Sequence, residues 1–153
     1  MKSSLFRLCL IKRSTLLYWL GFLMLGCSQQ EQAPLTIEQL HIMQIPPGQS
    51  TAAAYMTLKN NTDKTLVLNY VHSPIAADVE VHRVIYDQGM MQMRQVQHLS
   101  IDPGKTLNFE PGGYHLMLMG IEQAPAAGET FDISLEFENG YAIVGKAEVR
   151  SLH

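Results

Sequence analysis

The sequence has little cysteine. Of its 153 residues only Cys9 and Cys27 carry a thiol, and both lie near the N-terminus. Two cysteines are too few for a disulfide framework. Beyond Cys27 the only sulfur atoms belong to seven methionines. The domain that follows therefore cannot use disulfide exchange or thiolate chemistry, which excludes thiol-based catalysis.

Acidic residues are absent from the first 26 positions, which hold Lys2, Arg7, Lys12 and Arg13. The rest of the chain carries seven basic and all fourteen acidic side chains, a net charge of −7. A body this acidic is a poor match for a phosphate backbone, so we expect no nucleic-acid binding. A hydrophobic content of 46% with 16% charged residues is typical of a globular chain, and the length suits one domain. We expect a monomer.

No hydrophobic run near the N-terminus is long enough for a comfortable membrane span. The run from Thr15 to Leu25 has about a dozen residues, whereas a spanning helix needs roughly 20. Lys12 and Arg13 stop its extension toward the N-terminus. A basic start, a short apolar middle and a small residue before a break are typical of a secretory signal peptide, which we predict over residues 1–26.

The break after this run, Leu25-Gly26-Cys27-Ser28, resembles the lipobox of bacterial lipoproteins, in which the cysteine is lipidated and becomes the new N-terminus. The usual pattern has Leu three residues before the cysteine, where this chain has Met24. The resemblance implies acyl chains on Cys27, which anchor a protein without a spanning helix, and a polar tether over residues 27–34. It also implies a place in the bacterial cell envelope facing the periplasm, and Ser28 favours the outer membrane. An ordinary signal peptide cut nearby, with Cys27 a free thiol, is the alternative.

Short segments of alternating polarity, separated by turn residues at fairly even spacing, fill the chain after Pro34, and no stretch shows sustained helical periodicity. This pattern predicts an all-β sandwich or barrel of eight or nine strands. Asn139-Gly140 is the strongest two-residue hairpin signal. The predicted strands cover residues 35–43, 52–59, 65–71, 79–86, 91–96, 105–109, 114–119, 130–138 and 141–149.

Side chains that bind soft metals are concentrated in two segments. One holds His82, Met91 and Met93, and the other is His115-Leu116-Met117-Leu118-Met119. Neutral imidazole and thioether suit Cu(I), whereas Zn²⁺, Mg²⁺ and Ca²⁺ prefer oxygen, nitrogen or thiolate ligands. Alternate residues of a strand point to one face, so the imidazole and both thioethers of the second segment project together, and its two leucines project into the core.

The first segment contributes to a shared site only in the right hairpin register. If Tyr86 faces Gly89 across a two-residue turn, His82 lies directly opposite Met93, with Cβ atoms about 4.5–5.5 Å apart. A three-residue loop would send the two side chains to opposite faces. Met90 projects away from Met93, and we expect it in the core.

For each of these residues a structural role is the alternative, because methionine fills irregular core gaps and a lone histidine in a strand is commonly a surface residue. The convergence of two histidines and three methionines on adjacent turns favours a shared site. The other histidines have no partner at ligand spacing and are expected to be surface or structural residues: His41, His72, His98 and His153.

The candidate ligands follow a fixed spacing: His82, ten residues, Met93, twenty-one residues, His115, one residue, Met117. This spacing resembles the motif H-x10-M-x21-H-x-M of the periplasmic copper chaperone family known as PCuAC. The similarity covers roughly Leu35 to Arg150. The segments that carry it beyond the motif are Ala54-Tyr55-Met56, Glu80-Val81-His82, Gly89 to Arg94 and Pro111 to Gly120.

The resemblance implies a cupredoxin-like, Greek-key β-sandwich or barrel over residues 35–150 that carries Cu(I) and is not an enzyme. The implied acceptor of the copper is cytochrome c oxidase during its assembly, or a Sco-type thiol protein. The implied Cu(I) ligands are His82, Met93, His115 and Met117, and Met91 and Met119 are candidate auxiliary sulfur ligands.

Two other functions are alternatives. A blue-copper electron carrier would need a cysteine thiolate with two histidines, and no cysteine follows Cys27. A lipid-anchored binding module without metal would use the sandwich only for protein contacts. Hydrolysis finds little support, because no Ser, His and acid stand in a recognisable arrangement.

Overall fold

The computed structural model describes residues 33–151. The predicted signal peptide, the lipidation of Cys27 and all of the tether before Ala33 lie outside the described residues. None of the residues described forms a helix long and apolar enough to cross a bilayer. The strands are β1 (Leu35–Met43), β2 (Ala52–Asn60), β3 (Leu66–His72), β4 (Asp78–Asp87), β5 (Met90–Gln95), β6 (Leu99–Ile101), β7 (Thr106–Phe109), β8 (Tyr114–Met119), β9 (Thr130–Phe137) and β10 (Ala142–Arg150).

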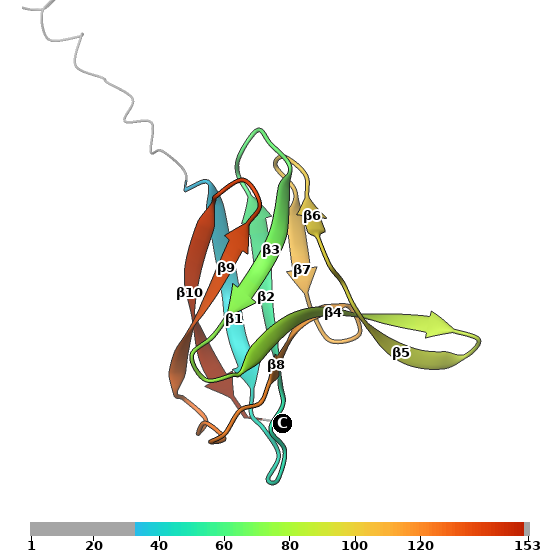
Figure 1. Ribbon diagram of the computed structural model, residues 1–153, viewed down its shortest axis with the longest axis vertical. Helices are drawn as coiled ribbons and strands as arrows, with labels where there is room; N and C mark the ends of the chain where they lie inside the picture. Colours follow the sequence, from blue (N-terminus) through green and yellow to red (C-terminus); the bar gives the residue numbers. More distant parts are fainter. Residues whose placement is uncertain (1–32, 152–153) are drawn as a thin grey trace, which may run out of the picture. The chain divides into compact units, whose positions relative to one another are not determined.

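All ten strands join in one mixed sheet of order β5-β4-β8-β7-β2-β1-β10-β9-β3-β6, with an additional pairing of β8 to β2. The pairs β1–β10 and β7–β8 are parallel, and the other pairs are antiparallel. Figure 1 shows β3 and β9 lying across β1 and β2, so the sheet curls back on itself and its two halves face each other. The edge strands are β5 and β6.

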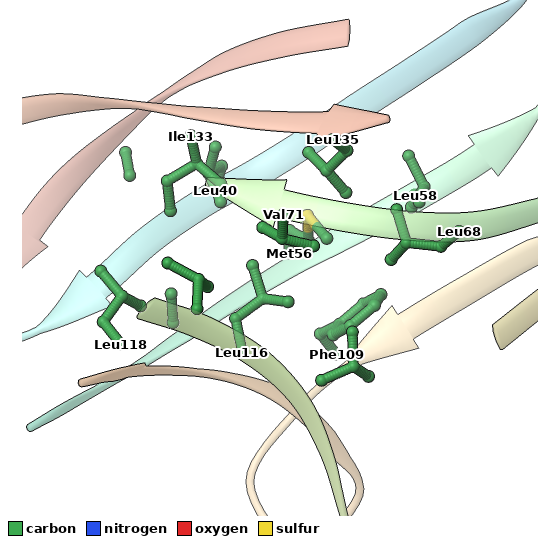
Figure 2. Packing of buried hydrophobic residues seen from close by; sticks show 14 of the residues in the cluster. Leu40, Met56, Leu58, Leu68, Val71, Phe109, Leu116, Leu118, Ile133 and Leu135 are labelled. Atoms are coloured by element: carbon green, nitrogen blue, oxygen red, sulfur yellow. The ribbon is translucent and has the colours of Figure 1, made fainter. Parts of the chain in front are cut away.

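The core lies between these two halves, and it is built by alternation along the strands. In β2 the even positions from Ala52 to Leu58 are buried and the odd positions are more exposed, as expected for a strand with one face on the core. Figure 2 shows Met56 of β2 and Leu116 of β8 gathered with Val71 of β3 and Leu135 of β9. Burial of each side chain of this size contributes roughly 1.5–3 kcal/mol.

The all-β prediction is confirmed, and each predicted strand forms within one residue of its expected ends. The expected count of eight or nine strands was too low, since the described residues form ten, one more than the nine predicted ranges. The additional strand is β6, whose three residues are too few to show alternation in the sequence.

The β9–β10 hairpin forms at the predicted place, but its loop has three residues instead of two. The N–H of Phe137 donates to the carbonyl of Tyr141 at 2.9 Å, and the N–H of Gly140 donates to the carbonyl of Phe137 at 3.0 Å. Gly140 has φ 82°. A turn followed by a residue in the left-handed region is the common three-residue hairpin loop, and it suits Gly140 because glycine has no Cβ.

The β4–β5 hairpin projects from the side of the sandwich (Figure 1). Its loop is Gln88-Gly89, with φ values of 49° and 79°, and Asp87 pairs with Met90 across it. Two positive φ values are typical of a type I′ turn, whose twist matches that of the strands it joins.

The hairpin therefore has a two-residue turn, but not in the register that would set His82 directly opposite Met93. Tyr86 pairs with Met91 instead of Gly89, His82 pairs with Gln95, and Met93 pairs with Val84. The physical reason is the glycine: the predicted register would place two residues with side chains, Asp87 and Gln88, in the turn and the glycine in the strand. The pairing register differs by two residues, so that His82 lies opposite Gln95 instead of Met93. Because side chains alternate with a period of two, His82 and Met93 still share one face.

Met90 was expected in the core and is instead 60% exposed. Five of the six residues of β5 are exposed, on both of its faces. The outer half of the hairpin extends beyond the sandwich (Figure 1), so alternation there does not separate a buried face from an exposed one.

Candidate metal centre

Three adjacent strands, β5, β4 and β8, form the part of the sheet that carries the candidate ligands, with β4 in the middle. His82 of β4 lies directly opposite His115 of β8. Met93 is displaced by one step of two residues from the position opposite His82, and Met117 follows His115 by two residues on β8. Side chains two positions apart, or directly opposed, point to the same face. The fold therefore places all four candidate ligands on one face of this three-stranded segment.

The two histidines form the centre of this cluster. Their ring centroids lie 5.8 Å apart with an interplanar angle of 53°. His115 is only 4% exposed, and the side chain of His82 is 17% exposed. Behind them Leu116 and Leu118 turn into the core with no exposure, as predicted for alternate residues of this strand. Two imidazoles held at directly opposed positions are close enough to share one ion.

The two thioethers flank the imidazole pair on opposite sides along the strands. Met117 lies opposite Glu80, two positions from His82 in one direction. Met93 lies opposite Val84, two positions from His82 in the other direction, and it is 55% exposed. Diagonal neighbours across a strand pair are about 7–8 Å apart, within reach of long side chains. Each methionine can therefore approach the imidazole pair from its own side.

Met91 and Met119 lie farther from the imidazole pair. Met91 pairs with Tyr86 and Met119 pairs with Asp78, each four positions along β4 from His82. Four residues of strand span about 13 Å. Both side chains share the face of the cluster but lie beyond its ends, so the arrangement does not favour their role as auxiliary ligands, which stays a prediction.

Glu80 also lies on this face, and its carboxylate is not a soft ligand. Its Oε2 lies 2.6 Å from Nε2 of His82. The other ring nitrogen of His82, Nδ1, is buried, and it is the one buried side-chain nitrogen or oxygen in the described part of the chain without a hydrogen-bond partner. The sequence signal for this contact was the spacing of Glu80 and His82, two positions apart on a strand, where both side chains point to one face.

The surroundings of His115 favour the neutral form of its ring. Burial lowers the pKa of His115 below its usual value, and the charge of nearby His82 acts in the same direction. The carbonyl of Gly113, 3.4 Å from Nδ1 of His115, opposes this by favouring the charged ring. The neutral form is the one that binds a metal ion.

A family of known proteins matches most of the described domain. Residues 35–149, three quarters of the chain, match the model of a family described as "LpqE-like: Putative lipoprotein LpqE-like". The chain belongs to the LpqE-like family. The curated relative "Putative lipoprotein Lxx21020" of Leifsonia xyli subsp. xyli is 30% identical over 94 residues, which are 61% of this chain and 57% of that protein.

Two solved structures share the fold of this LpqE-like domain. The solution structure of CuI-DR1885 from Deinococcus radiodurans is 30% identical, with 80% of this chain and 83% of that one covered and a TM-score of 0.65. The copper-bound PCuAC domain from PmoF2 is 22% identical, with 78% and 95% covered and a TM-score of 0.66. The resemblance to the PCuAC family and the cupredoxin-like fold expected from it are thereby confirmed. The matching segment spans 57% of the length of the Leifsonia xyli protein and 50% of that of a second curated relative, a protein of Rickettsia prowazekii that is 32% identical over 91 residues.

The remaining histidines of the LpqE-like domain lie apart from the cluster. Nδ1 of His41 lies 2.7 Å from the carbonyl of Gln39, the ring of His72 stacks on Tyr70, and His98 pairs with Glu138 at 3.0 Å. These contacts agree with the surface or structural roles expected for them. His153 lies outside the described residues. Within residues 33–151, no three His, Cys, Asp or Glu side chains are arranged to hold a metal ion.

The lowered pKa of His115 predicts how the stability of the LpqE-like domain depends on pH. In the unfolded chain this ring regains its ordinary pKa of about 6.5. Below that pH the ring binds a proton more readily in the unfolded state than in the folded state. The free energy of unfolding therefore falls as the pH is lowered, by at most about 1.4 kcal/mol per pH unit for one group. Above it, this group adds no pH dependence.

Urea denaturation of the metal-free protein between pH 7.5 and pH 5 checks this expectation against His115→Gln, which removes the titrating ring. The variant should lose less stability over this range than the parent protein. Equal losses in the two proteins would contradict the assigned direction of the pKa shift.

Proposed function

We propose that this domain binds Cu(I) through His82, Met93, His115 and Met117 and acts as a copper chaperone. The observation that carries the proposal is the directly opposed imidazole pair, with ring centroids 5.8 Å apart, flanked on the same face by the two thioethers. Imidazole and thioether form a soft donor set that suits Cu(I). Zn²⁺ sites use thiolate, imidazole or carboxylate ligands instead.

The charge of the chain and its relatives support the same proposal. Residues 27–153 carry a net charge of −7, and Glu80 lies on the face of the cluster, opposite Met117. Negative charge near a site attracts a cation. Among the relatives, DR1885 has a structure with Cu(I), and the PCuAC domain of PmoF2 has one with copper bound. The Cu(I) proposal transfers this property of those proteins to the present chain.

Delivery, as distinct from storage, is supported by the exposure of one candidate ligand. Met93 is 55% exposed on a hairpin that projects from the sandwich. Thioether ligands exchange readily, and a ligand set open on one side lets a ligand of the acceptor enter as Met93 leaves. We propose a carrier that moves the ion between proteins and catalyses no reaction on a substrate.

The proposal also covers the location of the domain in the cell and the protein that accepts its copper. A lipid on Cys27 would hold the domain on the outer membrane, facing the periplasm, with residues 27–34 as tether. The acceptor would be a cytochrome c oxidase subunit or a Sco-type protein. A monomeric domain with its hairpin free suits such transient contacts. The family's description as a lipoprotein supports the anchor, and the acceptor rests on the resemblance of the motif.

Competition for Cu(I) with a chromogenic chelator tests the proposal on the full chain in detergent, with Cys9→Ser and Cys27→Ser removing both thiols. We expect uptake of one Cu(I) per chain. X-ray absorption should then count two nitrogen and two sulfur neighbours, and an apo copper-acceptor domain of cytochrome c oxidase should remove the ion. A protein that takes up no Cu(I) would leave the metal-free binding module as the better explanation.

A further inference from the structure

The contact between Glu80 and His82 decides which nitrogen of His82 carries a proton. Nε2 of His82 lies 2.6 Å from Oε2 of Glu80, a short, strong hydrogen bond. An ionised carboxylate can only accept hydrogen bonds, so Nε2 is the donor. The neutral ring then has its lone pair on Nδ1, the other nitrogen.

Nδ1 of His82 is the atom that this arrangement leaves without a partner. It is buried and makes no hydrogen bond. Among the described residues, no other buried side-chain nitrogen or oxygen lacks a hydrogen-bond partner. A buried polar atom without a partner costs about 1–3 kcal/mol. Native proteins keep such atoms rarely, and each one calls for an explanation such as a bound ion.

We propose that Glu80 is a positioning residue that fixes the tautomer of His82 and presents Nδ1 to the copper ion. The inference rests on the proposed function, and it names the donor atom and the residue that selects it. Histidines that bind metal ions characteristically donate their other N–H to a carboxylate or a carbonyl, and this contact sets the ring orientation and raises its basicity. Glu80 has this relation to His82.

His115 has the complementary arrangement on the facing strand. Its Nδ1 lies 3.4 Å from the carbonyl oxygen of Gly113, an acceptor, so the proton lies on Nδ1 and the lone pair on Nε2. The copper ion therefore binds Nδ1 of His82 and Nε2 of His115, on rings with centroids 5.8 Å apart. One ring is oriented by a side-chain carboxylate and the other by the backbone.

Glu80 acts through His82 and is not itself a ligand. Cu(I) is soft and prefers imidazole and thioether to carboxylate oxygen. The negative charge of Glu80 still contributes to Cu(I) binding, because a carboxylate that is hydrogen-bonded to a ligand lies near the cation. The side chain is 25% exposed, so Glu80→Gln, which keeps its volume, is needed beside Glu80→Ala to separate loss of the contact from loss of packing.

The test uses Glu80→Gln, Glu80→Ala and a matched control, Asp78→Asn, in the full-length protein with both cysteines replaced by serine. Glu80→Gln keeps an oxygen acceptor for Nε2–H. Asp78→Asn removes a carboxylate from the same strand and face, two positions farther from His82. Long-range ¹⁵N–¹H spectra of the histidine rings at about pH 8 report the tautomer of His82 without copper, and on addition of Cu(I) they report which nitrogen resonance moves.

We expect the Nε2–H tautomer in the parent protein, in Glu80→Gln and in Asp78→Asn, and a shift toward the Nδ1–H tautomer in Glu80→Ala. Cu(I) should move the Nδ1 resonance of His82 in the parent protein. The Cu(I) affinity of Glu80→Ala should fall by about 10–100-fold, as for other partners of metal-binding histidines. Glu80→Gln should recover most of this loss, and Asp78→Asn should bind as the parent does.

An Nδ1–H tautomer in the copper-free parent would overturn the role of Glu80 while leaving the Cu(I) function intact. So would movement of Nε2 in place of Nδ1, or unchanged affinity in Glu80→Ala. A parent protein with the Nε2–H tautomer that takes up no Cu(I) would instead overturn the proposed function, and with it the role assigned to Nδ1.

Discussion

Replacing Met93 and Met117 together by leucine is expected to abolish measurable Cu(I) competition with a chromogenic chelator. Leucine keeps nearly the same volume and removes only the sulfur. Both thioethers lie on the face of the imidazole pair, one on each side of it. Only the two imidazole nitrogens would remain as ligands. Removal of a residue that merely contacts a ligand lowers metal affinity by roughly 10–100-fold, so we expect the loss of both sulfur ligands to lower Cu(I) affinity further than that. Each single variant should lose part of this affinity.

The matched control is Met90→Leu. Met90 lies on the same hairpin, is exposed to a similar degree as Met93, at 60% against 55%, and projects to the other face. Its replacement should leave Cu(I) affinity unchanged. If the double variant binds Cu(I) as tightly as the parent, or if Met90→Leu weakens binding as much as Met93→Leu, the assigned ligands are wrong.

Asn60→Ala is expected to destabilise the fold by about 3 kcal/mol or more, since each buried polar group left without its partner costs about 1–3 kcal/mol. Asn60 is fully buried at the end of β2. Its Nδ2 donates to the carbonyls of Lys64, Ile101 and Asp102 at 2.7, 2.9 and 3.2 Å. Its Oδ1 accepts from the N–H and the hydroxyl of Thr62 at 2.9 and 2.7 Å.

One amide thus joins the end of β2, the loop that leads to β3, and the end of β6. Alanine would remove the partner of the Thr62 N–H and the amide donor of the buried Ile101 carbonyl. It would also remove one of two hydrogen bonds from the carbonyls of Lys64 and Asp102, which keep those from Thr62 Oγ1 and the Lys105 N–H. Urea denaturation of the metal-free protein measures the effect. Asn108→Ala is the control, because Asn108 is exposed and makes one long side-chain hydrogen bond, 3.3 Å, to Thr57. We expect it to change stability by less than about 0.5 kcal/mol; similar losses in both variants would show that the Asn60 hydrogen bonds contribute little.

Much of the fold could be predicted from local pattern. Alternation in β8 predicted that Leu116 and Leu118 enter the core while His115 and Met117 face away from it, and the structure has this arrangement. The reason is that strand geometry has a period of two residues, so sidedness follows from the chain alone. Nine of the ten strands were found in this way.

Turns and edges were less predictable. The register of the β4–β5 hairpin depended on which position of a type I′ turn Gly89 occupies, and composition alone did not show this. Asn139-Gly140 similarly indicated a hairpin without fixing the length of its loop. The expectation that Met90 is buried was wrong because one face of a strand is buried only where a second layer of the sandwich covers it. The outer part of the β4–β5 hairpin extends beyond that layer (Figure 1).

The sequence by itself determined the soft donor types, their spacing and their alternation, because these properties are carried by neighbouring residues. Only the tertiary structure decided that β4 lies between β5 and β8, which sets His82 opposite His115. It also decided that Glu80 meets Nε2 of His82 and leaves Nδ1 buried without a partner. Strand pairing joins segments that are distant along the chain, and the burial of Nδ1 depends on the strands around it. Neither can be obtained from the two-residue repeat, which indicates only that Glu80 and His82 share a face.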